Sequence, residues 1–405
     1  MIGKILILIL LLILIVIHIA GTKTWFSPPD LYFLWTAVLI FFPVCFLYPD
    51  YNWEILGILW WLFSCILFKA GHLLGVKLSF SAHIPRFERS IRSVNSNYVL
   101  IAYFVLGILY SVILLSTHGF SIFRITNKAE LYRINNFLQG YRYSNLDENE
   151  GIVQQICLAF TYGLPTCAGY ILPSAKTIKG KLLCFCGIIP NILIVVLNNA
   201  KAGLIIATIL FISGYIIRYI DIYGIEPQLT WKRIRKLLFF FMAFLIFMFF
   251  AIKLRYNSDA ARASTGNIII VLREYIFGCT VNFDYYFISR IKDWSIRATI
   301  LKYSNILTAN MFWIHYFGYL GALLLWFVRG IISGSSYACL MQGRATIIDK
   351  VLLVYCYVSA LYFFTYMAFS YTTVIIGVFF LFPFFLMTYR SKKEYVWMAP
   401  LKANM

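Results

Sequence analysis

Long stretches without a charged side chain recur along the whole sequence, and they restrict the fold more than any other feature. Examples are Ile5–Ile17, Phe239–Ile252 and Val374–Met387, which contain no acidic or basic residue. Each approaches the roughly 20 apolar residues that a helix needs to cross the hydrocarbon core of a bilayer. Inside lipid the backbone must satisfy its own hydrogen bonds, which a helix does within one segment. The sequence therefore predicts an all-α polytopic membrane protein.

Composition supports this fold class and excludes one class of partner. Hydrophobic residues make up 61% of the 405 residues and charged residues only 13%, whereas soluble domains carry about 25% charged residues. The formal net charge is +19, but a nucleic-acid partner would need a solvated basic face. The basic residues instead occupy short connections between apolar stretches, where they act as a signal for membrane topology. We therefore expect no nucleic-acid partner.

The apolar pattern predicts about eleven transmembrane helices in a single membrane domain that covers residues 1–405. The expected spans are 4–21, 31–48, 55–75, 98–117, 152–172, 182–197, 202–217, 237–252, 306–328, 348–368 and 371–388. Residues 329–340 either extend the ninth helix or form a short re-entrant segment.

The distribution of basic residues predicts the orientation, because Lys and Arg in short connections prefer the cytoplasmic side. Connections 69–97, 173–181 and 218–236 are rich in them and fall on one side of the predicted topology. Two long connections, at about 118–151 and 253–305, fall on the other, periplasmic side. They contain aromatic and aliphatic residues that can pack, so we expect ordered outer caps. Function is therefore expected outside the cytoplasm.

Basic residues outnumber acidic residues in the second long connection. The basic residues are Lys253, Arg255, Arg262, Arg273, Arg290, Lys292, Arg297 and Lys302, and the acidic ones are Asp259, Glu274, Asp284 and Asp293. An outward basic cluster next to lipid favours an anionic ligand, and the planar arginine fork matches phosphate and pyrophosphate. We expect Arg255, Arg262 and Arg273 to bind pyrophosphate, with contact to lipid head groups as the alternative.

Lys201 is the only basic residue in the short connections 49–54, 198–201 and 369–371. It lies at the predicted N-terminus of a helix, where free backbone N–H groups and the helix dipole attract anions. We therefore add Lys201 to the pyrophosphate-binding residues. The alternative is a lysine whose charge merely reaches up to the membrane surface.

Three residues on the outer side are candidates for acid–base catalysis. Glu274 follows Arg273 in an apolar stretch, where ionisable groups are usually paired or functional, so a structural Arg–Glu pair is the alternative. Asp284 is flanked by aromatic residues of the kind that stack on sugars. His315 lies at the outer end of the ninth predicted helix and titrates near neutral pH. We expect His315 to be the general base ahead of Asp284 and Glu274, with a structural histidine as the alternative.

No motif in the sequence indicates a metal or a cofactor. The nine cysteines lie mostly within apolar stretches, and no group of them has the spacing of a zinc site. The sequence also lacks a His-Glu-x-x-His motif and a phosphate-binding glycine loop. We expect metal-independent chemistry and no cofactor.

Two short segments resemble the Wzy-type polymerases of O-antigen and oligosaccharide repeat units. In that family an Asn-x-x-Thr leads into an aromatic run that ends in Asp-Phe-Gly-x-x-Gly. The matching residues here are Asn305, Thr308, Phe317, Gly318 and Gly321, whereas Tyr316 stands in place of the aspartate. The segment Asn198–Leu204 is similar to a small-residue and arginine segment of the family, with Lys201 in place of the arginine.

The resemblance implies a glycosyltransferase of the bacterial inner membrane, active in O-antigen or related surface polysaccharide synthesis. Such an enzyme transfers a glycan from undecaprenyl pyrophosphate to another lipid-linked repeat unit at the periplasmic face. The implied partners are the undecaprenyl-pyrophosphate-linked oligosaccharide, membrane lipids and a chain-length regulator protein.

Two other functions are alternatives. A flippase for the same lipid-linked oligosaccharide would place ionisable residues along a central path and often has repeated halves. The sequence contains few charges within the predicted helices and no internal repeat. A membrane O-acetyltransferase would place His or Arg residues along a path for the acyl donor from the cytoplasm.

Overall fold

The computed structural model describes residues 2–21, 25–81, 96–144, 151–198, 201–228, 230–255, 264–289, 308–364 and 372–388. Within these ranges the regular secondary structure is entirely helical, with no β-strand. Seven helices are long and apolar enough to cross a membrane, namely Pro28–Leu47, Ile55–Ser79, Asn97–Thr117, Ile152–Ser174, Ile178–Asn198, Lys201–Tyr223 and Ala309–Met341. The chain is therefore an all-α membrane protein, as the apolar stretches predict.

Three shorter apolar helical segments accompany these seven: Gly3–Ile19, Met242–Leu254 and Thr373–Met387. The helices of the bundle are α1 (Ile2–Gly21), α2 (Pro28–Phe42) with the π-helical turn η1 (Pro43–Leu47), α3 (Ile55–Ser81), α4 (Ser96–Thr117), α6 (Ile152–Ile171) with the 3₁₀ turn η3 (Leu172–Ser174), α7 (Ile178–Cys186), α8 (Ile189–Asn198), α9 (Lys201–Tyr223), α10 (Trp231–Arg255), α13 (Ala309–Met341), α14 (Ile347–Tyr362), α15 (Thr372–Phe379) and α16 (Leu381–Thr388). Each predicted span coincides with one or two of these helices, while the count of eleven crossings stays a prediction.

Several predicted boundaries differ from the structure. The span predicted at 182–197 is divided into α7 and α8 at Gly187 and Ile188, and the last span is divided into α15 and α16 at Phe380. Of the two alternatives for residues 329–340, the structure shows the extension of the ninth helix, because residues 329–341 continue α13. That helix is interrupted at Gly318, whose φ of 71° and ψ of 174° lie outside the helical region.

Glycine contacts explain why α13 continues past residue 328. Gly330 and Gly334 lie directly against the α3 backbone, and a Cβ atom on either would overlap the carbonyl oxygen of Phe68 or of His72. Gly71 of α3 makes the reciprocal contact with α13. Small residues of this kind let two helix backbones approach closely inside a membrane. The close packing with α3 thus supports α13 along this length.

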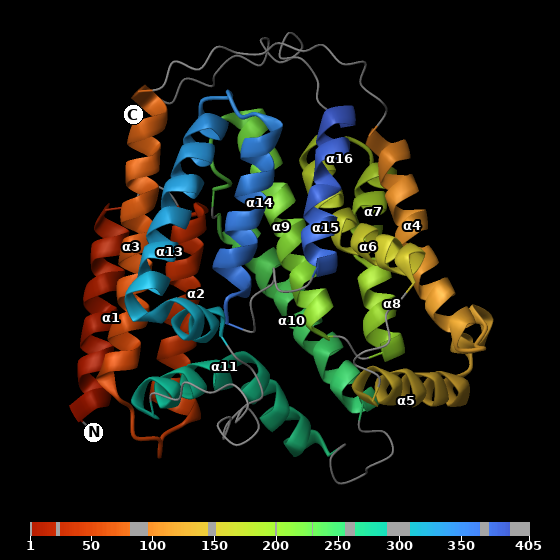
Figure 1. Ribbon diagram of the computed structural model, residues 1–405, viewed down its shortest axis with the longest axis horizontal. Coiled ribbons are helices and arrows are strands. Elements are labelled where there is room, and N and C mark those ends of the chain that lie inside the picture. Colours follow the sequence, from red (N-terminus) through yellow and green to blue (C-terminus); the bar gives the residue numbers. More distant parts are fainter. Residues whose placement is uncertain are drawn as a thin grey trace.

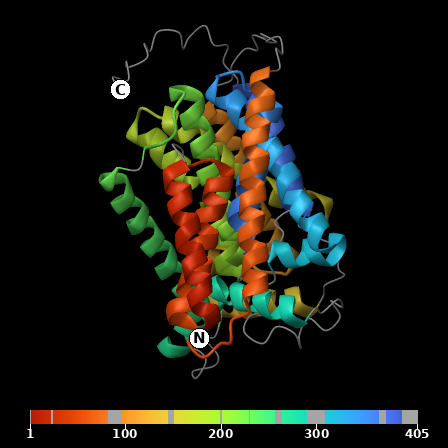
Figure 2. The ribbon, with the colours of Figure 1, turned by 90° about the vertical axis from the view of Figure 1, so that its left-hand side faces the viewer.

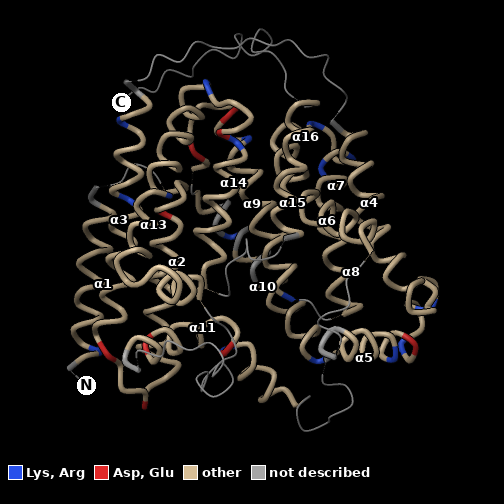
Figure 3. Tube along the Cα trace, viewed as in Figure 1, with Lys and Arg blue, Asp and Glu red and all other residues tan. Residues whose placement is uncertain are grey.

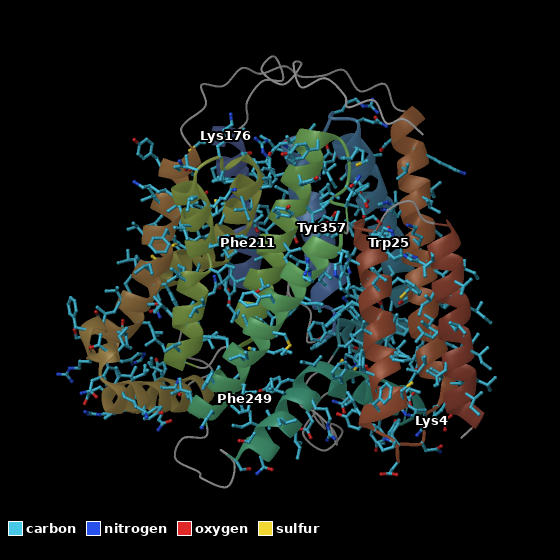
Figure 4. All side chains as sticks on the ribbon, turned by 180° about the vertical axis from the view of Figure 1, so that it is seen from behind. Lys4, Trp25, Lys176, Phe211, Phe249 and Tyr357 are labelled. Atoms are coloured by element: carbon cyan, nitrogen blue, oxygen red, sulfur yellow. The ribbon has the colours of Figure 1, made fainter. Side chains whose placement is uncertain are left out.

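Two helices from the long connections lie at one end of the bundle. Figure 1 shows α5 (Lys128–Ser144) and α11 (Thr265–Ser289) lying across the end at which α1 begins, and we call this the α11 end. Figure 4 shows Lys4 at the α11 end and Lys176 at the opposite end. Charged residues gather mainly towards these two ends, as Figure 3 shows. A helical bundle whose charged residues lie mainly towards its two ends fits a bilayer.

Helix α10 contacts the bundle mostly near its C-terminal end. Figure 2 shows α10 inclined away from the neighbouring helices over much of its length. Among its described side chains, only those of Met248, Ala251 and Ile252 are buried. Ala251 packs in a small apolar cluster with Val195 and Leu204.

Candidate functional site

Helix α11 carries most of the described candidate residues, and its contacts fix it against α2 and α3. Thr280 donates a hydrogen bond of 2.8 Å from its hydroxyl to the Leu39 carbonyl oxygen. The Phe283 ring meets the Trp61 ring edge to face at 4.9 Å. Cys279 and Phe283, four residues apart and therefore on one helix face, are both fully buried. This apolar face positions the polar residues of α11 beside the connection between η1 and α3.

Asp284 is fully buried in that position. Its Oδ2 accepts a 3.0 Å hydrogen bond from the backbone N–H of Glu54. Gly57 leaves room for the carboxyl, since a Cβ atom there would lie 3.2 Å from Oδ1. Burial raises the pKa of Asp284 to about 7, although the Glu54 N–H and the Tyr51 hydroxyl favour the ionised form. A carboxyl that titrates near neutral pH can take a proton from a hydroxyl and release it again.

Two cations lie about one helical turn before the middle of α11. Arg273 is a residue of this helix, and Lys201 contacts it from α9. The Nζ of Lys201, the first residue of α9, lies 5.3 Å from the Tyr275 ring centre, and Lys201 is only 5% exposed. The Arg273 guanidinium lies 4.9 Å from the Tyr48 ring centre. Helix positions two apart face different directions, so Arg273 and the Tyr275 ring that Lys201 contacts lie on different faces of α11. The structure thus brings two of the four predicted anion-binding residues to the same short stretch of helix.

Glu274 lies next to Arg273, and burial raises the pKa of its carboxyl while the neighbouring guanidinium lowers it. Asp284 follows ten residues later, which corresponds to about 15 Å along a helix axis. The two predicted acids therefore do not form a pair. Glu274 belongs with the cations, and Asp284 lies at the other part of α11.

His315 lies on the short piece of α13 that precedes the interruption at Gly318. Thr308 begins this piece, since its side chain accepts a 3.2 Å hydrogen bond from the Met311 N–H, the arrangement of an N-cap. The His315 ring meets the Tyr316 ring at 5.0 Å. Immediately after the interruption, the Tyr319 ring contacts Phe287 of α11 at 4.8 Å. His315 is thus four residues from the contact between α13 and α11.

The side chains of the two remaining predicted anion-binding residues, Arg255 and Arg262, lie outside the described part of the structure. Arg262 lies outside the described residues, and Arg255 is the last residue of α10, with a side chain that also falls outside them. Their expected role therefore stays a prediction.

Arg329 is a candidate that sequence reasoning missed. It is 9% exposed, and its guanidinium lies 4.1 Å from the Trp313 ring centre, 5.3 Å from that of Trp326 and 5.1 Å from that of Tyr355. Nη2 donates a 2.6 Å hydrogen bond to the Tyr355 hydroxyl. An arginine inside an apolar run is a signal for a functional residue. Arg329 follows the predicted span 306–328, in the stretch that the sequence left open between a helix extension and a re-entrant segment, so it was not recognised as a charge within a helix.

Several other charged side chains inside the bundle pair with an opposite charge or accept hydrogen bonds. Lys69 lies 2.5 Å from the buried Asp30 carboxylate, and Lys350 lies 2.9 Å from that of Asp221. Glu226 accepts hydrogen bonds from the backbone N–H groups of Trp25 and Phe26. These contacts join neighbouring helices, and they show more ionisable residues within the bundle than the sequence reading expected.

Comparison with protein-family models, with curated proteins and with solved structures finds no match for this chain. Within the described ranges, no group of three or more His, Cys, Asp and Glu side chains is arranged to hold a metal ion.

Proposed function

We propose that this protein polymerises lipid-linked oligosaccharide repeat units at the periplasmic face of the bacterial inner membrane. The observation that carries the proposal is that α11 holds a buried carboxyl, Asp284, with a pKa of about 7 and, about three helical turns earlier, Arg273 next to the contact with Lys201 of α9. Glycosyl transfer from a pyrophosphate needs both chemistries, because a proton must be removed and negative charge must be stabilised.

The proposed reaction uses the two parts of α11 for different groups. Lys201 and Arg273 bind the pyrophosphate of the donor and stabilise its charge as the bond between the sugar carbon and the phosphate oxygen breaks. The acceptor hydroxyl oxygen forms the new bond to that carbon, and its proton passes to the Asp284 carboxylate. Burial favours Asp284 as the base, and His315 is the second candidate.

The proposed topology has eleven crossings, with the α11 end in the periplasm. We expect a membrane-impermeant thiol reagent applied from the periplasm to label Ser264→Cys and not Gln228→Cys, both of which are exposed positions. The unsubstituted chain is the control, because it has nine cysteines of its own. Labelling of position 228 alone would mean that the orientation is inverted.

The role of the cations gives a separate prediction. We expect Arg273→Ala and Lys201→Ala each to weaken donor binding by about tenfold or more, since each removes a charge-assisted contact to phosphate. Arg273→Lys should recover only part of the loss, because the bidentate geometry is absent. The measurement is the KM for the lipid-linked donor. Arg133→Ala on α5, whose side chain is 68% exposed, is the control. An unchanged donor KM in both alanine variants would contradict this role.

Purified protein reconstituted into vesicles with a lipid-linked repeat unit tests the function itself. Chain lengthening without movement of the lipid across the bilayer supports the polymerase. Movement without lengthening would instead indicate a flippase, an alternative that gains some support from the ionisable residues inside the bundle such as Asp30 and Arg329.

A further inference from the structure

Arg329 differs from Lys69 and Lys350, which pair with carboxylates. Among the residues that the structure describes, none of the carboxylates forms an ion pair with its guanidinium. The Nη1 atom is buried and has no hydrogen-bond partner, while Nη2 bonds to Tyr355. The guanidinium also lies over the rings of Trp313 and Trp326.

An uncompensated arginine inside a membrane bundle is costly, and unsatisfied buried donors are rare. Attraction to aromatic faces recovers part of this cost but leaves the donor on Nη1 unused. A bound anion would supply both the missing charge and the missing acceptor. Arginine is suited to an oxyanion because its planar fork forms two parallel hydrogen bonds with it.

We propose that Arg329 binds a phosphate-type oxyanion within the bundle, in a subsite distinct from the cations on α11. The hydrogen bond to Tyr355 orients the guanidinium, and the Trp313 ring lies against it. The phosphate belongs to the lipid-linked substrate or to a free phosphate compound. Its assignment to the substrate rests on the proposed function, whereas binding of the anion does not.

Trp313 connects this subsite to the candidate base. It lies on the piece of α13 before Gly318, two residues before His315. Since Nη1 is buried, an anion reaches it only when a neighbouring side chain moves aside, and the Trp313 ring is the nearest of the three aromatic rings to the guanidinium. Movement of Trp313 on binding would occur on the piece of helix that carries His315.

Titration of the purified full-length protein with inorganic pyrophosphate tests the proposal by calorimetry and by tryptophan fluorescence. We expect Arg329→Gln to lower the affinity by about tenfold or more and Arg329→Lys to lower it less. Arg344→Gln is the matched control, because that arginine follows the end of α13 and donates to the Ser79 carbonyl oxygen instead. Trp313→Phe should retain binding and reduce the fluorescence change.

The outcomes of these titrations show whether Arg329 binds an anion and which kind of phosphate it takes. Equal affinity in Arg329→Gln and in the unsubstituted protein overturns it, as does loss of polymerisation in that variant without a change in anion affinity. If Arg329→Gln fails to fold, Tyr355→Phe replaces it and should weaken pyrophosphate binding several-fold. A polyprenyl phosphate in nanodiscs forms the second arm, and binding there without binding of pyrophosphate assigns the subsite to a lipid-borne phosphate. Failure of both ligands to bind overturns the proposal, whatever the polymerisation assay shows.

Discussion

Replacing Asp284 by asparagine is expected to lower the rate of glycan chain extension by about 10²–10⁴-fold, the usual effect of losing a general base. Asparagine has nearly the same shape and can still accept the hydrogen bond from the Glu54 N–H, but it cannot take a proton. Donor binding should be retained, because the cations on α11 are unchanged. The rate of the unsubstituted protein should fall as the pH drops below about 7, and this limb should be absent from the residual activity of the variant.

The same substitution has an expected effect on stability that separates catalysis from folding. The folded protein holds a proton on Asp284 up to about pH 7, whereas the unfolded chain releases it near pH 4. Between these values the folded state binds more protons, so its stability decreases as the pH rises. Asp284→Asn removes this loss and should therefore raise the melting temperature at pH 8 relative to the unsubstituted protein, with little difference at pH 4.

Asp50→Asn is the control for both measurements, since Asp50 is an exposed residue of the connection before α3. Near-normal polymerisation by Asp284→Asn would exclude it as the base. In that case His315→Ala becomes the deciding variant, and a loss of similar size there would assign the base to His315.

The largest structural effect is expected from Gly334→Val. The side chain would have to occupy the position of the His72 backbone carbonyl, and neither helix can yield without losing the close contact along α3 and α13. Overpacking of this kind costs about 1–3 kcal/mol or more, and a backbone clash lies at the upper end. We expect most of the protein to be lost from the monodisperse fraction in detergent.

Gly140→Val on α5 is the matched comparison, because a Cβ atom there meets nothing within 4 Å. It should give a normal yield. Equal yields of the two variants would show that the contact between α3 and α13 does not limit folding.

The sequence predicts the presence of helices well because apolar stretches must form them in lipid, as for α4 and α6. It predicts boundaries less well where packing decides them. The sequence left open whether residues 329–340 extend the ninth helix or form a re-entrant segment, and contact of Gly330 and Gly334 with α3 accounts for the extension. That contact joins residues more than 250 positions apart, which a local pattern does not contain.

For the candidate site as well, local sequence patterns predicted the residues, but not the contacts that they make with distant segments. Basic excess and isolated charges pointed to Lys201, Arg273 and Asp284, which lie on or beside α11. Arg273 and Asp284 contact Tyr48 and Glu54, which lie in a connection more than 200 residues earlier, and no feature of that connection indicated these contacts. The separation of Glu274 from Asp284 became evident only once α11 was seen as one continuous helix.

The glycine contact makes α3 and residues 319–341 of α13 a single mechanical unit. Sliding or rotation of either helix would drive carbonyl oxygens into the opposing Cα positions, so the pair can shift only as one body. Trp313 and His315 lie before the interruption at Gly318 and are not held by that contact. Gly318 therefore separates the part of α13 that is fixed against α3 from a short segment that is not. Transient rearrangement of this protein should be concentrated on that segment, the nine residues before Gly318.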